Sequence, residues 1–161
     1  MATFNRTIRV PLLLKAGTAF TVSATAYTAN DVVGGSAKVY YGTGGGALLM
    51  GFSLLDDAVQ SEPYIVHIYK SAPSVIADHA AFAPTTADGK LELRTITVLA
   101  TDYEAANGGT YSVAHKYDPS YDQVALPEEC EGTIYVYLEC TSTPDYAATT
   151  DLYAEFVFWV D

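Results

Sequence analysis

At 161 residues the chain has the length of one domain and can bury a core without disulfides or metals. Half of its residues are hydrophobic, yet no apolar run approaches the roughly 20 residues that cross a bilayer, which predicts a soluble protein with no membrane partner. The formal charge of -11 repels phosphate backbones and argues against nucleic-acid binding through the main surface.

The basic residues gather at the start of the chain. Residues 1–30 hold Arg6, Arg9 and Lys15 and no acidic residue, so the remainder is strongly acidic. A basic and apolar leading segment on an acidic body is typical of a docking arm, and an ordinary first strand is an equal alternative. The segment lacks a long hydrophobic region and a small-residue cleavage site, which argues against a signal peptide.

Apolar and polar residues alternate with a period of two along most of the chain, and a helical period is nearly absent. Breakers rich in glycine, proline and aspartate separate the alternating runs, and this pattern predicts an all-β sandwich or barrel of about nine strands. The predicted strands span residues 6–14, 18–27, 36–42, 47–56, 63–70, 90–99, 109–117, 133–141 and 151–160. We assign residues 1–15 to an arm or first strand and residues 16–161 to one β-sandwich domain.

Two short helical turns are expected between strands. One covers residues 78–82, where Asp78 can cap the turn, Phe82 can anchor it on the sandwich and His79 is exposed. Asp88 and Gly89 then turn the chain into the next strand. The other covers residues 101–106, where Thr101 and Glu104 have the spacing of a capping box.

The thirteen tyrosines exceed what a core of this size needs. In the strand at 133–141, Ile134, Val136 and Leu138 share one face with Cys140, whereas tyrosines occupy the other face. Because tyrosine suits protein interfaces, this pattern favours contact between copies of the chain, with packing at sheet edges as the alternative. The expected contact residues are Tyr135, Tyr137, Tyr146 and Trp159.

Motifs of catalysis and cofactor binding are not found in the sequence, and we predict neither an enzyme nor a cofactor. A metal site built from His67, His115 and either Asp56 or Asp78 has no supporting spacing, and we predict no metal. Acidic loops leave calcium binding open as an alternative. The two cysteines, Cys130 and Cys140, are expected to be free thiols.

Three segments together resemble small all-β structural proteins of tailed-bacteriophage virions. They are AYTANDVVGG (26–35), DHAAFAPTTADGKL (78–91) and STPDYAATTDLYAEF (142–156). Two features depart from the pattern: His79 replaces an asparagine, and residues 116–132 have no counterpart. The matching residues are Tyr27, Asp31, Val32, Val33, Gly34, Gly35, Asp78, Ala80, Ala81, Phe82, Thr143, Pro144, Tyr146, Thr149, Asp151 and Leu152.

The resemblance implies a capsid decoration, or cement, protein. Such a protein is a jelly-roll sandwich that is made in the host cytoplasm, forms a homotrimer and binds the major capsid protein on the outer surface of the head. The leading segment is then expected to contact the shell, with basic side chains facing acidic groups and apolar ones packing. The contact residues are Phe4, Arg6, Ile8, Arg9, Leu12, Leu13, Leu14 and Lys15.

Two other functions remain open at this point. A carbohydrate- or receptor-binding sandwich would stack exposed tyrosines on sugars and hold Ca²⁺ with loop acids. A hydrolase using aspartate and histidine from separate loops would require a concave pocket with convergent polar groups.

Overall fold

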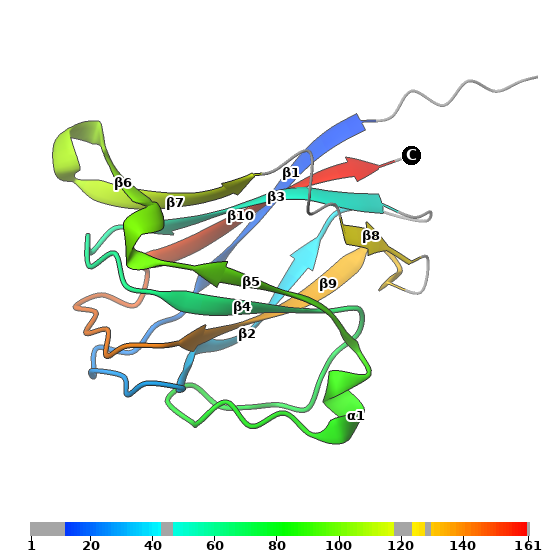
Figure 1. The fold of residues 1–161 in the computed structure, drawn as a ribbon, viewed down its shortest axis with the longest axis horizontal. Helices are drawn as coiled ribbons and strands as arrows, with labels where there is room; N and C mark the ends of the chain where they lie inside the picture. The colour runs from blue at the N-terminus through cyan, green and yellow to red at the C-terminus, as the bar shows by residue number, and fades with distance from the viewer. Residues whose placement is uncertain (1–11, 43–46, 118–123, 128–129, 161) are drawn as a thin grey trace, which may run out of the picture.

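The computed structural model describes residues 12–42, 47–117, 124–127 and 130–160. In these ranges the chain forms ten strands in two antiparallel sheets that pack as a sandwich (Figure 1). The strands are β1 (Leu12–Phe20), β2 (Val32–Tyr40), β3 (Ala47–Asp56), β4 (Tyr64–Tyr69), β5 (Glu92–Val98), β6 (Tyr103–Ala106), β7 (Tyr111–Tyr117), β8 (Val124–Leu126), β9 (Thr133–Cys140) and β10 (Leu152–Val160).

The strand order is that of a jelly roll. The first sheet runs β1-β10-β3-β7-β6, with β8 also pairing with β3, and the second runs β2-β9-β4-β5. When β6 and β8 are set aside, eight strands remain in two four-stranded sheets, and successive strands alternate between the sheets except at the β4–β5 connection. The predicted all-β jelly-roll sandwich is therefore confirmed.

The strand predicted at residues 18–27 is wrong, because β1 ends at Phe20. Beyond it the backbone turns to loop partners: the Val22 N–H donates to the Thr149 carbonyl at 3.2 Å and the Tyr27 N–H to the Pro144 carbonyl at 2.8 Å. Val22 and Tyr27 are buried, whereas Ala24 and Ala26 of the predicted alternation are exposed, so burial does not follow a period of two in this segment. Of the strand predicted at 6–14, residues 6–11 lie outside the described residues.

The helical turn predicted at residues 101–106 is also wrong. A single 3₁₀ turn covers Ala100–Asp102, and residues 103–106 form β6, which pairs with β7. The cap is made by Asp102, whose carboxylate accepts the Leu99 N–H at 2.6 Å. Neither β6 nor β8 was predicted.

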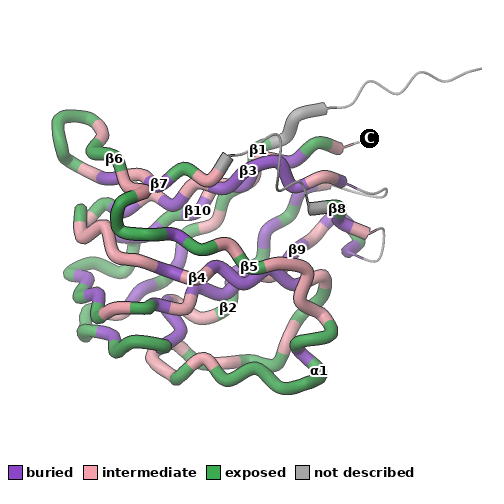
Figure 2. Tube along the Cα trace, in the orientation of Figure 1, coloured by how far each residue is buried: buried purple, intermediate pink, exposed green. Residues whose placement is uncertain are grey.

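Buried tyrosines lie both between the sheets and on the outer face of the second sheet, and the buried parts of the chain are purple in Figure 2. Six of them are almost fully buried: Tyr27, Tyr41, Tyr64, Tyr69, Tyr137 and Tyr146. The Tyr64 and Tyr146 hydroxyls hydrogen-bond to each other, and burial raises the pKa of both. Six of the thirteen tyrosines therefore belong to the interior, whereas Tyr40 and Tyr153 are exposed.

A long connection between β4 and β5 covers the outer face of the second sheet (Figure 1). It includes the helical turn α1 (Thr86–Gly89), and its Ile76, Phe82 and Leu91 pack against buried Tyr69 and Tyr137. The outer face of the first sheet has no comparable covering among the described residues.

Candidate functional site

The three segments that carry the phage resemblance meet at one end of the sandwich. The Asp78 carboxylate accepts the Tyr27 hydroxyl at 2.9 Å and the Gly34 N–H at 2.8 Å, which joins the first segment to the second. Tyr27 joins the first to the third, because its N–H donates to Pro144 and its ring contacts the Tyr146 ring edge-on at 6.5 Å. We call this cluster, made of these five residues, the motif junction.

The junction corrects the prediction that Asp78 caps a helical turn. The carboxylate bonds to distant segments, and residues 78–82 form a turn and an isolated bridge in which Asp31 pairs with Ala81. Burial above all, together with the neighbouring Asp78, raises the pKa of Tyr27, so the hydroxyl remains a donor at neutral pH. Asp78 is therefore a structural carboxylate that fixes the first segment against the second.

His79 is not the exposed residue that we expected. Its ring stacks on Tyr27 with centroids 3.9 Å apart, and its backbone adopts the left-handed region with φ of 63°. Its Nε2 is buried and has no hydrogen-bond partner in the described part of the chain. His79 thus packs the outer side of the junction.

The helical turn in the connection between β4 and β5 is α1, which lies later in the chain than the turn predicted at residues 78–82. Thr85 caps it, and the Asp88 carboxylate accepts the Thr85 N–H, the Thr85 hydroxyl and the Ser74 N–H at 2.7–2.8 Å. These hydrogen bonds, led by that from Ser74, lower the pKa of Asp88 to about 2. Phe82 anchors the connection as predicted, since its ring stacks on His67 with centroids 4.0 Å apart.

The three histidines do not form one site. His67 lies on the second sheet, where Nδ1 contacts Glu92 at 2.8 Å and Nε2 contacts Glu139 at 3.0 Å, so neither ring nitrogen is left for a metal. His115 lies on the first sheet, so the two are not neighbours across a sheet. Among the described residues no group of three or more potential ligands could hold a metal ion. Cys130 and Cys140 are buried free thiols, as predicted.

The expected shell-contact segment lies only partly within the described residues. Phe4, Arg6, Ile8 and Arg9 lie outside them, whereas Leu12, Leu13, Leu14 and Lys15 begin β1 and pair with the end of β10. The Lys15 ammonium contacts the Glu155 carboxylate at 2.7 Å.

Two of the four expected oligomer contacts are buried within the chain itself. Tyr137 is 1 % exposed beneath the β4–β5 connection, and its hydroxyl accepts the Ile76 N–H. Tyr146 is 1 % exposed between the sheets. Neither side chain offers surface to a second copy, and this part of the prediction is corrected. Tyr135 is half-buried and Trp159 is exposed, so contact at those positions stays a prediction.

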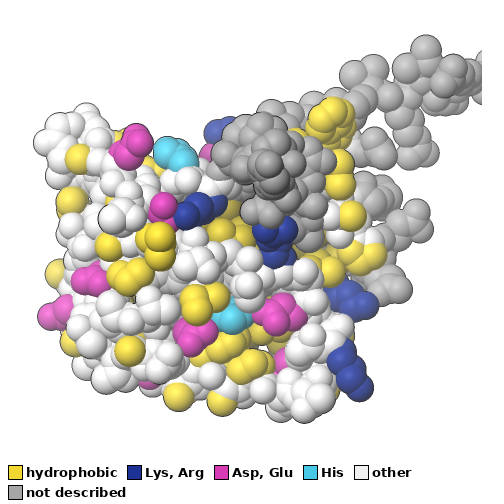
Figure 3. Space-filling view, in the orientation of Figure 1, with side chains coloured by type: hydrophobic (Ala, Val, Ile, Leu, Met, Phe, Trp, Pro, Cys, Tyr) yellow, Lys and Arg dark blue, Asp and Glu magenta, His cyan; other side chains and the backbone are white. Residues whose placement is uncertain are grey.

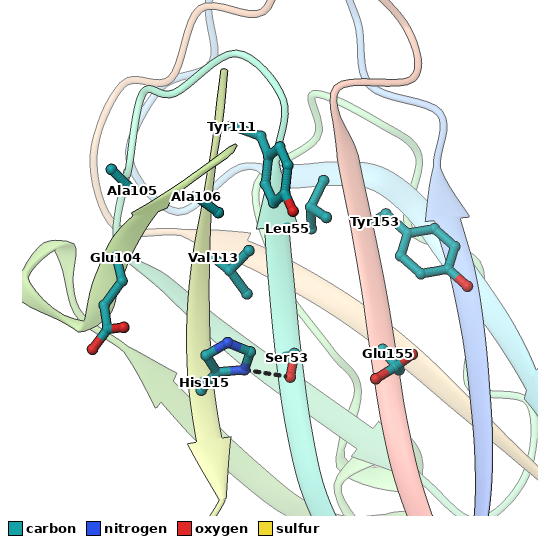
Figure 4. Close-up of a pocket in the computed structure, with 10 residues that line it drawn as sticks. All are labelled: Ser53, Leu55, Glu104, Ala105, Ala106, Tyr111, Val113, His115, Tyr153 and Glu155. Atoms are coloured by element: carbon teal, nitrogen blue, oxygen red, sulfur yellow. Dashed lines mark hydrogen bonds between the residues drawn. The ribbon is translucent and has the colours of Figure 1, made fainter. Parts of the chain in front are cut away.

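The uncovered face of the first sheet carries an open groove of about 330 Å³. Residues from β3, β6, β7 and β10 line it, and we call it the outer groove (Figure 4). Ser53 and His115, which are directly paired across β3 and β7, form a hydroxyl–imidazole hydrogen bond of 2.9 Å on its floor. In the described part of the chain no carboxylate bonds the other nitrogen of His115, so this pair lacks the orienting acid of a catalytic triad.

Of the residues that line this groove, the sequence analysis singles out only His115, as a possible metal ligand without supporting spacing. The other lining residues come from strands distant in the sequence. The alternation in β7 places Tyr111, Val113 and His115 on one face, and this was the available signal. The strands that lie beside β7 in the groove could not be identified from the sequence, because they depend on the pairing of β3 with β7 and of β3 with β10.

Comparison of the sequence with models of known protein families and with curated proteins finds no match. Among the described residues no helix is long and apolar enough to cross a membrane.

Proposed function

We propose that this protein is a bacteriophage capsid decoration protein that binds the assembled head and stabilises it. The observation that carries the proposal is the motif junction. The resemblance to virion structural proteins rests on three separate segments, and the hydrogen bonds of Asp78 and Tyr27 make these segments one structural unit. Three matching segments that contact one another in the fold support the resemblance more strongly than three segments without contact would.

The end of the sandwich where β1 begins is the proposed shell-facing end. Leu12, the first described residue of β1, pairs there with Val160 at the end of β10. Trp159 lies in the same part of β10 and is 43 % exposed. Lys15, near the start of β1, carries one basic side chain towards this end, whereas the Lys or Arg side chains at the right-hand margin of the space-filling view lie near α1 (Figure 3).

Binding to the assembled lattice alone stabilises the lattice by mass action. Each bound copy shifts the equilibrium between assembled and dispersed capsid subunits towards assembly. A trimer placed where capsomers meet would engage several subunits at once, and multivalency would raise its avidity without strong single contacts.

The leading segment provides the first test of the proposal. We expect deletion of residues 2–10 to abolish co-sedimentation with empty heads built from the phage's own major capsid protein. Arg6→Glu should weaken binding, and raised salt should weaken binding of the unaltered protein, because exposed charge pairs are screened. Lys90→Glu, an equal charge change at an exposed position outside this end, serves as the control. Sedimentation of the deletion variant to the same extent as the unaltered protein would refute the proposed contact.

A further inference from the structure

We propose that the outer groove binds a neutral oligosaccharide. The inference goes beyond shell binding, because it assigns a ligand to a different surface. Tyr153 in the groove pairs with Ala19, whereas the proposed shell-facing end lies at the opposite end of the same strands, where Leu12 pairs with Val160. A copy bound to a head through that end keeps the groove open to solvent.

Two tyrosines form the apolar part of the groove. Tyr111 and Tyr153 flank Leu55, one on the side of β7 and the other on the side of β10 (Figure 4). Tyr153 is 40 % exposed. An aromatic ring beside an open sheet surface offers a flat apolar area with a hydroxyl at its rim, which suits the C–H face and the hydroxyl edge of a sugar ring.

The position of the Tyr153 ring depends on Gly17 of the neighbouring strand. A Cβ at Gly17 would lie 1.8 Å from the Tyr153 hydroxyl oxygen. The ring therefore lies over the glycine, at the place where any side chain would stand. This arrangement holds the ring flat against the sheet, in the manner of an aromatic residue packed on a cross-strand glycine.

Polar groups line the other half of the groove. Glu104 and Glu155 stand on opposite sides of the hydrogen-bonded Ser53–His115 pair (Figure 4). Carboxylates accept hydrogen bonds from hydroxyl groups, and the imidazole and the serine hydroxyl supply further donors and acceptors. A few polar groups beside apolar walls are the usual composition of a small-ligand site, and the volume lies at the lower end of such sites.

The charges select a neutral ligand over an ionic one. The Glu104 carboxylate disfavours phosphate, sulfate and acidic sugars. Glu155 is paired with Lys15, so only Glu104 lacks an ion-pair partner within the described residues. One such charge gives a lysine-rich peptide little to bind, whereas an oligosaccharide uses the carboxylates, the hydroxyl–imidazole pair and both rings.

The test is isothermal titration calorimetry with neutral oligosaccharides of glucose, galactose, mannose and N-acetylglucosamine, chosen after an array screen. We expect saturable binding to at least one series. Tyr111→Ala should weaken that binding about tenfold through loss of the stacking surface, and Glu104→Gln should also weaken it. Tyr40→Ala, at an exposed tyrosine of the second sheet, should leave it unchanged.

Gly17→Ala provides a second way to perturb the groove, because it displaces the Tyr153 ring and removes no groove side chain. Circular dichroism of each variant separates loss of folding from loss of binding. Lack of binding to every neutral series at millimolar concentration would overturn the proposal, as would equal binding by the Tyr111→Ala variant. Groove-dependent binding of a lysine-rich peptide without binding of neutral sugars would also overturn it. Head binding by the Tyr111→Ala variant is measured in parallel, so failure of this inference remains distinguishable from failure of the decoration role.

Discussion

The Asp78 carboxylate joins two segments that are more than forty positions apart in the sequence, through the Tyr27 hydroxyl and the Gly34 N–H. Tyr27 is nearly fully buried, so its hydroxyl has few alternative partners. Removal of the Asp78 carboxylate leaves the Tyr27 hydroxyl and the Gly34 N–H without an acceptor. A buried donor without a partner costs more free energy than the hydrogen bond itself contributes.

We therefore expect Asp78→Ala to lower the free energy of unfolding by about 1–3 kcal/mol for each stranded donor. Tyr27→Phe should cost about 1 kcal/mol. In the double variant the two effects should be less than additive, because both substitutions remove the same bond. Urea unfolding of the four proteins measures the coupling, with exposed Asp57→Ala as the control. Fully additive effects would mean that the hydrogen bond contributes nothing.

Asp88 gives the α1 turn a defined dependence on pH. Its pKa of about 2 in the folded chain is below the ordinary value for aspartate of about 3.9. A lowered pKa stabilises the folded state while the group is ionised, so the contribution is present above about pH 4 and is lost as the pH falls towards about 2. The Asp88→Asn variant should thus have a lower free energy of unfolding than the unaltered protein at pH 5. This gap in free energy should narrow as the pH is lowered. Urea unfolding at a series of pH values measures the gap, with Asp57→Asn as the control; a gap that stays constant down to pH 2 would contradict the assignment.

At the scale of elements, β2 depends on a glycine that no other residue can replace without strain. The register of β2 against β9 shifts between Val33 and Ala37, and Gly34 lies in this irregularity with φ of 73°. A Cβ at Gly34 would lie 2.8 Å from the Phe20 Cβ, so the end of β1 and the start of β2 approach each other only because this glycine has no side chain.

Gly34→Ala should lower the free energy of unfolding by about 1–3 kcal/mol, because it adds backbone strain and a steric clash. Gly89→Ala is the matched control, since nothing lies within 4 Å of a Cβ at that position. It should be neutral or slightly stabilising through the entropy of the unfolded chain. Thermal unfolding of both variants compares them directly, and equal midpoints would show that the close approach at Gly34 is not required.

The alternation of residues predicted most of these elements because it reports local burial. β3 was predicted with its observed bounds, and the buried face of β9 was predicted residue by residue. The end of β1 was not predictable in this way, because the apolar alternation of the sequence continues to Ala26, whereas the Val22 N–H already bonds to the Thr149 carbonyl outside the sheet. Likewise Thr101 and Glu104 have the spacing of a capping box, but the pairing of β6 with β7 makes residues 103–106 a strand. The outer groove required the register of several strand pairs, which no local pattern contains.

At the scale of the whole molecule, the jelly roll separates two surfaces. The proposed shell-facing end combines the start of β1, the end of β10 and exposed Trp159. The outer groove lies towards the other end of the first sheet. Burial of Tyr137 and Tyr146 leaves Tyr135 and Trp159 as the expected trimer contacts.

Electron microscopy of empty heads mixed with the purified protein tests the decoration role most directly. We predict added density on the outer surface of the shell, in groups of three copies where capsomers meet, with the end of the sandwich that holds Leu12 and Val160 towards the shell. Heads without added density at saturating protein, or single copies bound through the outer groove, would contradict it.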